Sequence, residues 1–358
     1  MDGRIDRLRR LLHTHGLDAL LVTQPENRRY LTGFTGSAGT VIVTPERALL
    51  LVDFRYVEQA GRESPLLEVV PAKNRPEEDL PPLLQEIGGR CWGFESTHVT
   101  VAQYEKLRPL FEGAGIELQG VENLVEGLRA VKEPEELEWI REAVRITDEA
   151  FAHFLEWVRP GVTEREAAWE LEKTMRENGA EAMAFPIIVA SGPNGAMPHH
   201  RPGDRRLQRS EPIVIDMGAV YQGYQADMTR TICLGEADER FWEIYRLVRA
   251  AQERAEAGIR AGMPSCEADG LAREVIAAAG YGEQFGHGLG HSIGLSTHER
   301  PQLSPRLEDP IPVRCTVTVE PGIYIPGWGG VRIEDVVVVH EDGTEVLTRS
   351  TKEPLVAV

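Results

Sequence analysis

The sequence has few cysteines and no long apolar run. Its cysteines are Cys91, Cys233, Cys266 and Cys315, and none of them forms a CxxC pair. This spacing argues against a zinc ribbon or a thioredoxin-like redox site. No segment is long and apolar enough to span a membrane. The N-terminal segment alternates charges with Ile5, Leu8 and Leu12 on one helical face, unlike a signal peptide. We therefore expect a cytoplasmic protein with reduced cysteines.

Positive charge is also scarce. The chain carries 39 Lys and Arg against 57 Asp and Glu, a formal net charge of -18. Binding to nucleic acid or to an anionic membrane requires a clustered basic face, and the basic residues here are scattered. We expect neither partner, and we interpret the acidic excess as a solvated surface.

The length of 358 residues predicts two domains. In the first third, short apolar runs such as ALLVT, TVIVT and CWGFE alternate with amphipathic stretches, which indicates an α/β domain over residues 1–126. A long helix opened by Pro134 follows the predicted boundary. The remaining residues, 127–358, combine amphipathic helices with strand-like runs. They predict an α+β domain with helices on one side of a curved, mostly antiparallel sheet.

Two pairs of acidic residues stand in predicted hairpins. Asp216 and Asp227 are equidistant from a point between Tyr221 and Gln222, so they are predicted to lie opposite each other across a strand-turn-strand segment. Cross-strand partners have Cβ atoms roughly 5 Å apart. Two carboxylates this close repel each other, and a bound cation is the simplest way to keep both ionised.

Glu320 and Glu334 repeat the arrangement around Gly327, in a Gly-rich turn. Solvated acids at strand ends would explain either pair taken alone. The occurrence of both pairs favours a metal site.

Histidines gather in two further segments. GHGLGHSIGLSTHERP contains His287, His291 and His298, but its glycines disfavour a helix and it lacks the glutamate of HExxH, so it does not indicate a zincin. ASGPNGAMPHH ends on His199 and His200, and a tandem histidine after a turn is also typical of an exposed loop.

Taken in order, these segments resemble the active-site segments of the pita-bread metallopeptidases, the creatinase/aminopeptidase P/prolidase superfamily. The resemblance begins near Lys132 and rests on ASGPNGAMPHH, VIDMGAVYQGYQADMTRT, GHGLGHSIGLSTHERP, TVEPGIYI and VRIEDVVVV. NRRYLTGFTGSAG and LLLVDFRYVEQA resemble the smaller N-terminal domain of aminopeptidase P and prolidase. The resemblance implies a C-terminal pita-bread catalytic domain, a smaller N-terminal α/β creatinase-like domain and a homodimer.

The resemblance also implies specific roles for ten residues. The implied ligands of two divalent metal ions are Asp216, Asp227, His291, Glu320 and Glu334. His199 and His298 would contact the substrate and the developing tetrahedral centre, and Glu320 would also accept a proton. Substrate binding falls to His287, with Tyr324 and Arg332 in support. An oxygen-rich ligand set favours Mn(II), with Co(II), Zn(II) and Fe(II) also compatible.

The implied reaction is hydrolysis of a bond to a proline nitrogen, in peptides with proline in the second position. Several prolidases have an arginine after the proline of the HExP segment, where this sequence has Gln302. We therefore expect an Xaa-Pro aminopeptidase that cleaves extended peptides faster than dipeptides. The alternative is a prolidase, an Xaa-Pro dipeptidase, in which Arg300 could supply the cation. A metal-free creatinase-type hydrolase and a non-catalytic peptide-binding module are disfavoured by the complete ligand set.

Overall fold

The computed structural model describes residues 2–357, which divide into two compact units, one ending at Arg129 and the other beginning at Ala130. The N-terminal unit is α/β, as predicted. Its six-stranded sheet has the order β4-β3-β2-β1-β5-β6, with β2 antiparallel to both of its neighbours and the other pairs parallel. The strands are β1 Ala19–Val22, β2 Thr40–Val43, β3 Ala48–Val52, β4 Glu68–Pro71, β5 Cys91–Glu95 and β6 Glu117–Val121.

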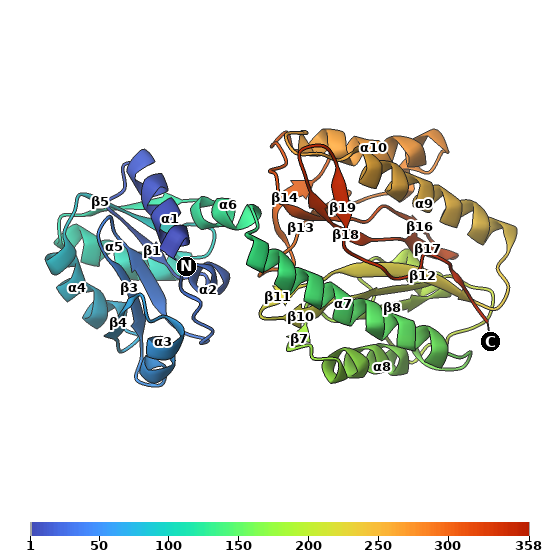
Figure 1. Ribbon diagram of the computed structural model, residues 1–358, viewed down its shortest axis with the longest axis horizontal. Helices are drawn as coiled ribbons and strands as arrows, with labels where there is room; N and C mark the ends of the chain where they lie inside the picture. The colour runs from blue at the N-terminus through green and yellow to red at the C-terminus, as the bar shows by residue number, and fades with distance from the viewer. Residues whose placement is uncertain (1, 358) are drawn as a thin grey trace. The chain divides into compact units, whose positions relative to one another are not determined.

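Helices alternate with these strands along the chain (Figure 1). They are α1 Asp2–Thr14, α2 Pro25–Thr32, α3 Val57–Glu63, α4 Pro76–Ile87, α5 Val101–Gly113 and α6 Leu124–Ala130. Leu80 and Leu84 of α4 and Leu107 and Phe111 of α5 pack on the sheet around buried Trp92.

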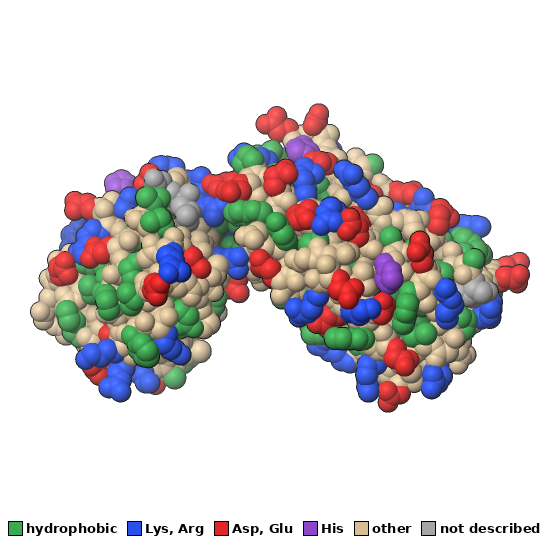
Figure 2. Space-filling view, turned by 60° about the horizontal axis from the view of Figure 1, so that its bottom comes forward, with side chains coloured by type: hydrophobic (Ala, Val, Ile, Leu, Met, Phe, Trp, Pro, Cys, Tyr) green, Lys and Arg blue, Asp and Glu red, His purple; other side chains and the backbone are tan. Residues whose placement is uncertain are grey.

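No helix within residues 2–357 is long and apolar enough to cross a lipid bilayer. Basic and acidic side chains are interspersed on the face seen in Figure 2, as in a solvated surface.

The C-terminal unit contains four α-helices among the described residues, and its strands form two larger sheets and two small ones instead of one. The helices are α7 Pro134–Trp157, α8 Glu164–Glu177, α9 Glu239–Gly258 and α10 Ser265–Ala278, with 3-10 turns η1 Gly192–Ala196 and η2 Gly282–Gln284. One core packs α7 and α8 on the four-stranded sheet β20-β12-β9-β8. A second core packs α9 and α10 against the five-stranded sheet β14-β13-β15-β18-β19 and the ladder β16-β17 (Figure 1).

The strands of this unit are mainly antiparallel, with β20 parallel to β12. The third sheet has the order β11-β10-β7. The bounds are β7 Ala182–Met183, β8 Ile188–Ser191, β9 Ile213–Met217, β10 Ala219–Tyr221, β11 Tyr224–Gln225, β12 Met228–Leu234, β13 Gly290–Ser292, β14 Glu299–Leu303, β15 Thr316–Val319, β16 Gly322–Ile325, β17 Gly329–Arg332, β18 Asp335–Val339, β19 Thr344–Val346 and β20 Leu355–Val356.

The register of the first predicted hairpin was wrong. Tyr221 pairs with Tyr224, so the turn is Gln222-Gly223, and both of its residues have positive φ, 48° and 76°. A two-residue turn of this kind sets the register of the strands that it joins. Asp216 therefore lies opposite Thr229, two residues beyond Asp227. Because side chains alternate along a strand, the two aspartates are diagonal neighbours on one face instead of direct partners.

The register of the second hairpin was correct. Gly322 pairs with Arg332 in one ladder and Val319 pairs with Asp335 in the next, so both ladders are centred on Gly327. Glu320 and Glu334 lie in the gap between these ladders. The two hairpins therefore present four carboxylates at strand ends and breaks.

A substitution at Gly218, between β9 and β10, tests this strand arrangement. A Cβ at this position would lie 1.9 Å from the carbonyl oxygen of Ala226. We expect Gly218→Ala to lower the free energy of unfolding by about 1–3 kcal/mol or more, as overpacking does. The matched control is Gly270→Ala inside α10, where the nearest atom would be 4.0 Å away, and which should raise it by up to about 1 kcal/mol. Urea unfolding monitored by circular dichroism measures both, and equal midpoints would contradict the packing at Gly218.

Candidate metal centre

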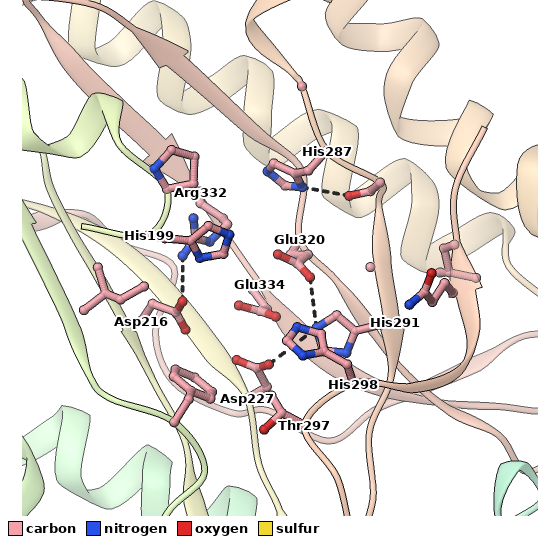
Figure 3. A pocket seen from close by; sticks show the side chains of 18 of the residues that line it. His199, Asp216, Asp227, His287, His291, Thr297, His298, Glu320, Arg332 and Glu334 are labelled. Carbon is pink, nitrogen blue, oxygen red and sulfur yellow. Dashed lines mark hydrogen bonds and ion pairs between the residues drawn. The ribbon is translucent and has the colours of Figure 1, made fainter. Parts of the chain in front are cut away.

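A cavity of about 620 Å³ opens in the C-terminal unit. It is lined by all ten residues that the sequence singled out, which are His199, Asp216, Asp227, His287, His291, His298, Glu320, Tyr324, Arg332 and Glu334. Figure 3 shows the four carboxylates grouped together, with His291 beside Glu320 and Asp227 and with Arg332 beside Asp216. Strand ends from both larger sheets meet here, because the backbone N–H of Glu334 donates to the carbonyl of Thr229 at 3.0 Å.

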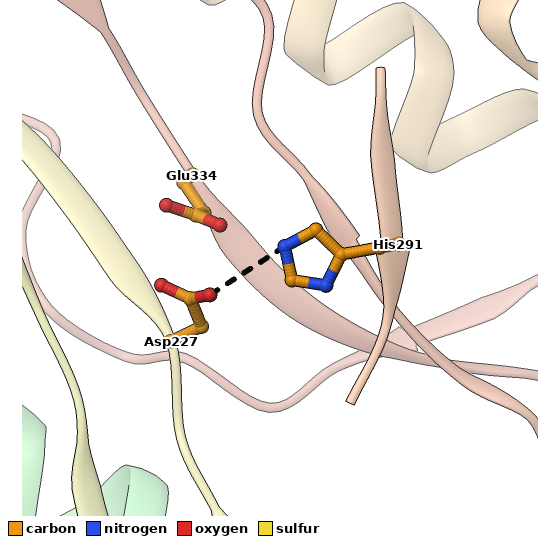
Figure 4. Close-up of side chains that lie close together, drawn as sticks. All are labelled: Asp227, His291 and Glu334. Carbon is orange, nitrogen blue, oxygen red and sulfur yellow. Dashed lines mark ion pairs between the residues drawn. The ribbon is translucent and has the colours of Figure 1, made fainter. Parts of the chain in front are cut away.

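Three of these residues form a compact cluster. Single ligand atoms of Asp227, His291 and Glu334 all lie within 4.8 Å of one another (Figure 4). Nε2 of His291 is 3.7 Å from Oδ2 of Asp227 and 3.4 Å from Oε1 of Glu320. The side chains thus converge with oxygen and nitrogen atoms that can coordinate a metal.

The hydrogen bonds of His291 orient it as a ligand. Its Nδ1 lies 3.1 Å from the carbonyl oxygen of Ser292, and a carbonyl can only accept, so Nδ1 carries the proton. Burial lowers the pKa of His291, which keeps the ring neutral near pH 7. The lone pair of Nε2 therefore points at carboxylate oxygens, an arrangement that a cation between them satisfies. A ring fixed through Nδ1–H is typical of metal-bound histidine.

The electrostatics of the carboxylates also fit a cation. Burial, followed by the charges of Glu334, Asp216 and Glu320, raises the pKa of Asp227 well above its usual value. Burial and the charges of Glu320 and Asp216 raise the pKa of Glu334 in the same way. Within the described residues, Oδ1 of Asp216 is buried without a hydrogen-bond partner. The residues present therefore fit bound divalent cations, which would keep all four carboxylates ionised.

Arg332, Tyr324 and His287 form a hydrogen-bonded chain at the edge of the cluster. The Arg332 guanidinium donates to Oδ2 of Asp216 at 2.7 Å and to the hydroxyl of Tyr324 at 2.8 Å. The Tyr324 hydroxyl lies 2.9 Å from Nε2 of His287, and Nδ1 of His287 lies 2.8 Å from the Gly288 carbonyl. Tyr324 therefore donates to Nε2. Burial raises its pKa to about 12, so it stays protonated.

The structure separates the two tandem histidines. His199 lines the cavity. His200 instead places Nε2 2.8 Å from Oε2 of Glu164, a fully buried carboxylate in α8. His298 reaches the cavity from the adjoining loop, with its ring centroid 4.3 Å from that of His291.

Sequence reasoning missed the residues that hold these loops. Glu164 accepts hydrogen bonds from the backbone of Ser191, the side chain of Asn194 and the backbone of Gly203. Buried Lys132 lies 3.0 Å from Oε2 of Glu299, whose other oxygen accepts from the backbone N–H of Ser296. An acid in a first helical turn is an ordinary sequence signal. The partners of Glu164 are 27 or more residues away, so no local pattern reveals its role.

Comparisons with known proteins identify relatives along the whole chain. Residues 138–341 match the metallopeptidase family M24, and residues 4–131 match the creatinase/prolidase N-terminal domain. The chain is 36% identical to an Xaa-Pro dipeptidase of Pyrococcus furiosus, over 99% of this chain and 100% of the relative. The solved structure of an Xaa-Pro dipeptidase from Bacillus anthracis is 42% identical, with a TM-score of 0.95 and 99% of each chain covered. That of an X-Pro aminopeptidase from Thermotoga maritima is 38% identical, with a TM-score of 0.91 and 99% of each chain covered.

Removing one carboxylate from the cluster tests whether it binds metal. We expect Asp227→Asn to keep the fold while losing metal, because the amide withdraws a negative charge from the cluster. Activity should fall by more than the roughly 10–100-fold that loss of an outer-shell partner causes. Metal analysis after reconstitution with Mn(II), alongside circular dichroism, measures the change. The control is Asp342→Asn at an exposed site. Metal content equal to wild type in Asp227→Asn would remove Asp227 from the ligand set.

Proposed function

The chain belongs to metallopeptidase family M24, and from this membership we propose that it hydrolyses Xaa-Pro dipeptides at a pair of divalent metal ions. The observation that carries the proposal is the convergence of Asp216, Asp227, His291, Glu320 and Glu334 on one cavity. The relatives from Pyrococcus furiosus and Bacillus anthracis, both described as Xaa-Pro dipeptidases, support this substrate class. The dipeptidase proposal replaces our expectation of an aminopeptidase. An aminopeptidase stays the second candidate, because the relative from Thermotoga maritima is described as one.

We expected an aminopeptidase because Gln302 stands where several prolidases have an arginine. Gln302 does line the cavity. Arg300, the expected substitute cation, is absent from the lining and lies 4.0 Å from Asp309 on the surface. A neutral side chain at one point of the wall does not prevent another residue from supplying the cation. The substrate preference therefore depends on the whole lining.

Manganese is the metal that we propose, because four carboxylates and one imidazole form a hard, oxygen-rich ligand set. A metal pair bound there would supply Lewis acidity toward a water molecule and toward the scissile carbonyl oxygen.

The neighbouring Thr229 and Thr318 hold two of the proposed ligands by hydrogen bonds. The Thr229 hydroxyl donates to Oε2 of Glu334 at 2.6 Å, and the Thr318 hydroxyl donates to Oε1 of Glu320 at 3.1 Å.

Glu320 is the residue that we assign to proton transfer. The hydrogen bond from Thr318 occupies Oε1 and leaves Oε2 to accept a proton from the attacking water. Bound cations would keep this carboxylate ionised before the reaction, so that it can act as a base. Glu320 would then pass it to the proline nitrogen as that nitrogen leaves.

His199 and His298 are the candidate donors to the oxyanion. Both line the cavity beside the carboxylate cluster, and burial lowers the pKa of His298, so its ring is neutral near pH 7. A neutral imidazole donates through one ring nitrogen, which suits an oxygen that gains charge in the transition state.

Two further expectations stay predictions. The homodimer is implied by the resemblance of the sequence, and the cytoplasmic location is expected from its composition. The metal-free hydrolase and the peptide-binding module stay disfavoured, because all five implied ligand residues line one cavity.

The tandem histidines provide a paired test of the catalytic assignment. We expect His199→Ala to lower kcat by about 10²-fold or more, the scale for losing one transition-state donor, with metal binding unchanged. His200→Ala should instead lower the melting temperature, because it removes one partner of buried Glu164. Steady-state kinetics and thermal unfolding of both variants separate the roles. Equal, small effects on kcat would indicate that His199 is an ordinary loop residue without a catalytic role.

Substrate length tests the proposed activity. Mn(II)-loaded enzyme is offered Ala-Pro and the same pair extended by one residue at its C-terminus. We expect kcat/KM to be at least about tenfold higher for the dipeptide, because its carboxylate can form a charge-assisted hydrogen bond that the extended chain lacks at that position. Faster cleavage of the extended peptide would favour the aminopeptidase.

A further inference from the structure

A dipeptidase needs a cation for the free carboxylate beside the proline ring, and this cavity offers few. Arg201 and Arg332 are the Lys or Arg side chains among its lining residues. Arg332 is 4% exposed and already donates to Asp216, Tyr324 and Thr229. Its guanidinium belongs to the carboxylate cluster. Arg201 is therefore the cation of the lining that remains for the substrate.

The Arg201 side chain is available for such a contact. It is exposed, and within residues 2–357 it makes no hydrogen bond or ion pair with another side chain or the backbone. Arg205 and Arg273 differ in this respect. Arg205, four residues later, is paired with Glu211 at 2.6 Å, and Arg273 is paired with Asp269.

The backbone around Arg201 is anchored on both sides. Glu164 contacts His200 at 2.8 Å immediately before it and accepts from the backbone N–H of Gly203 at 3.2 Å shortly after it. Burial opposes ionisation of Glu164, but the hydrogen bonds from Ser191, Asn194 and His200 together hold its pKa below the usual value. An ionised, buried carboxylate thus fixes the loop, while the guanidinium that the loop carries stays free. This combination suits a binding residue that is held in place before the substrate arrives.

We propose that Arg201 binds the free carboxylate of the Xaa-Pro dipeptide and so determines the preference for dipeptides. The inference rests on the proposed function and names its specificity residue. A guanidinium can bind a carboxylate through two parallel hydrogen bonds. It also supplies an opposite charge for the substrate carboxylate, which loses contact with water on entering the cavity. Gln302, on the same lining, can add a neutral donor through its amide. The arginine missing from the HERPQ segment is thus replaced from a different loop.

The test compares Ala-Pro with Ala-Pro-amide, which lacks the negative charge, in Mn(II)-loaded enzyme. Arg201→Gln should raise KM for Ala-Pro by about 10-fold to 100-fold, the range for hydrogen bonds to a charged group. It should leave kcat and the KM for Ala-Pro-amide within about threefold of wild type, since the reacting groups are untouched. Arg201→Lys should recover part of the loss, because it restores the charge without the bidentate geometry.

The matched control is Arg300→Gln, which removes an equal charge from the nearby strand β14 outside the cavity lining. It should change neither KM. Equal changes for the two substrates in Arg201→Gln, or no change for Ala-Pro, would overturn the assignment. Metal content and circular dichroism, measured on the same samples, show whether the loop and the metal centre are intact.

A second readout separates this inference from the proposed function. Wild-type enzyme that shows no preference for the dipeptide would contradict the dipeptidase activity itself. Competitive inhibition by L-proline and by L-prolinamide then still reports on carboxylate binding. Weaker inhibition of Arg201→Gln by L-proline alone supports the role of Arg201, whereas an equal loss with both inhibitors overturns it.

Discussion

Repulsion among four carboxylates in one cavity, three of them buried, is the constraint on which the C-terminal unit depends. Two hairpins bring Asp216, Asp227, Glu320 and Glu334 into one cavity, where burial makes their charges costly. Within the described residues, Arg332 is the one guanidinium that pairs with one of these four carboxylates, that of Asp216. One positive charge cannot offset four negative ones. The arrangement therefore fits additional cations, and the lone pair of the neutral imidazole of His291 is a further ligand for them.

Charged groups around the cluster are paired with groups of opposite charge or with several hydrogen-bond donors. Asp335, next to a ligand in sequence, is 2.7 Å from Arg230 and 2.6 Å from Lys352. Buried Glu164 has several donors, and Lys132 is paired with Glu299. These pairs hold the strands and loops that carry the site, because a buried charge with a missing partner would be strongly destabilising. Oδ1 of Asp216, which is buried without a hydrogen-bond partner, contrasts with these paired charges around the cavity.

The sequence predicted the ten cavity residues through motifs, and the structure brings all of them together. Symmetry about Gly327 gave the correct register because the ladders on both sides of the gap share one centre. The same reasoning failed for Asp216 and Asp227, because the positive φ of Gln222 and Gly223 moved the turn by one residue. Long-range contacts also could not be predicted from local sequence patterns. Glu164 lies 36 residues before its partner His200. Whether Arg201 has a partner likewise depends on the folded structure and not on the local sequence.

Anomalous X-ray diffraction from crystals of the Mn(II)-loaded protein tests the central claim most directly, because it locates manganese without reference to activity. The account predicts two anomalous peaks among the side-chain oxygens of the four carboxylates, one of them also in contact with Nε2 of His291. A cavity without an anomalous peak at full manganese loading, or manganese bound at other residues, would contradict it.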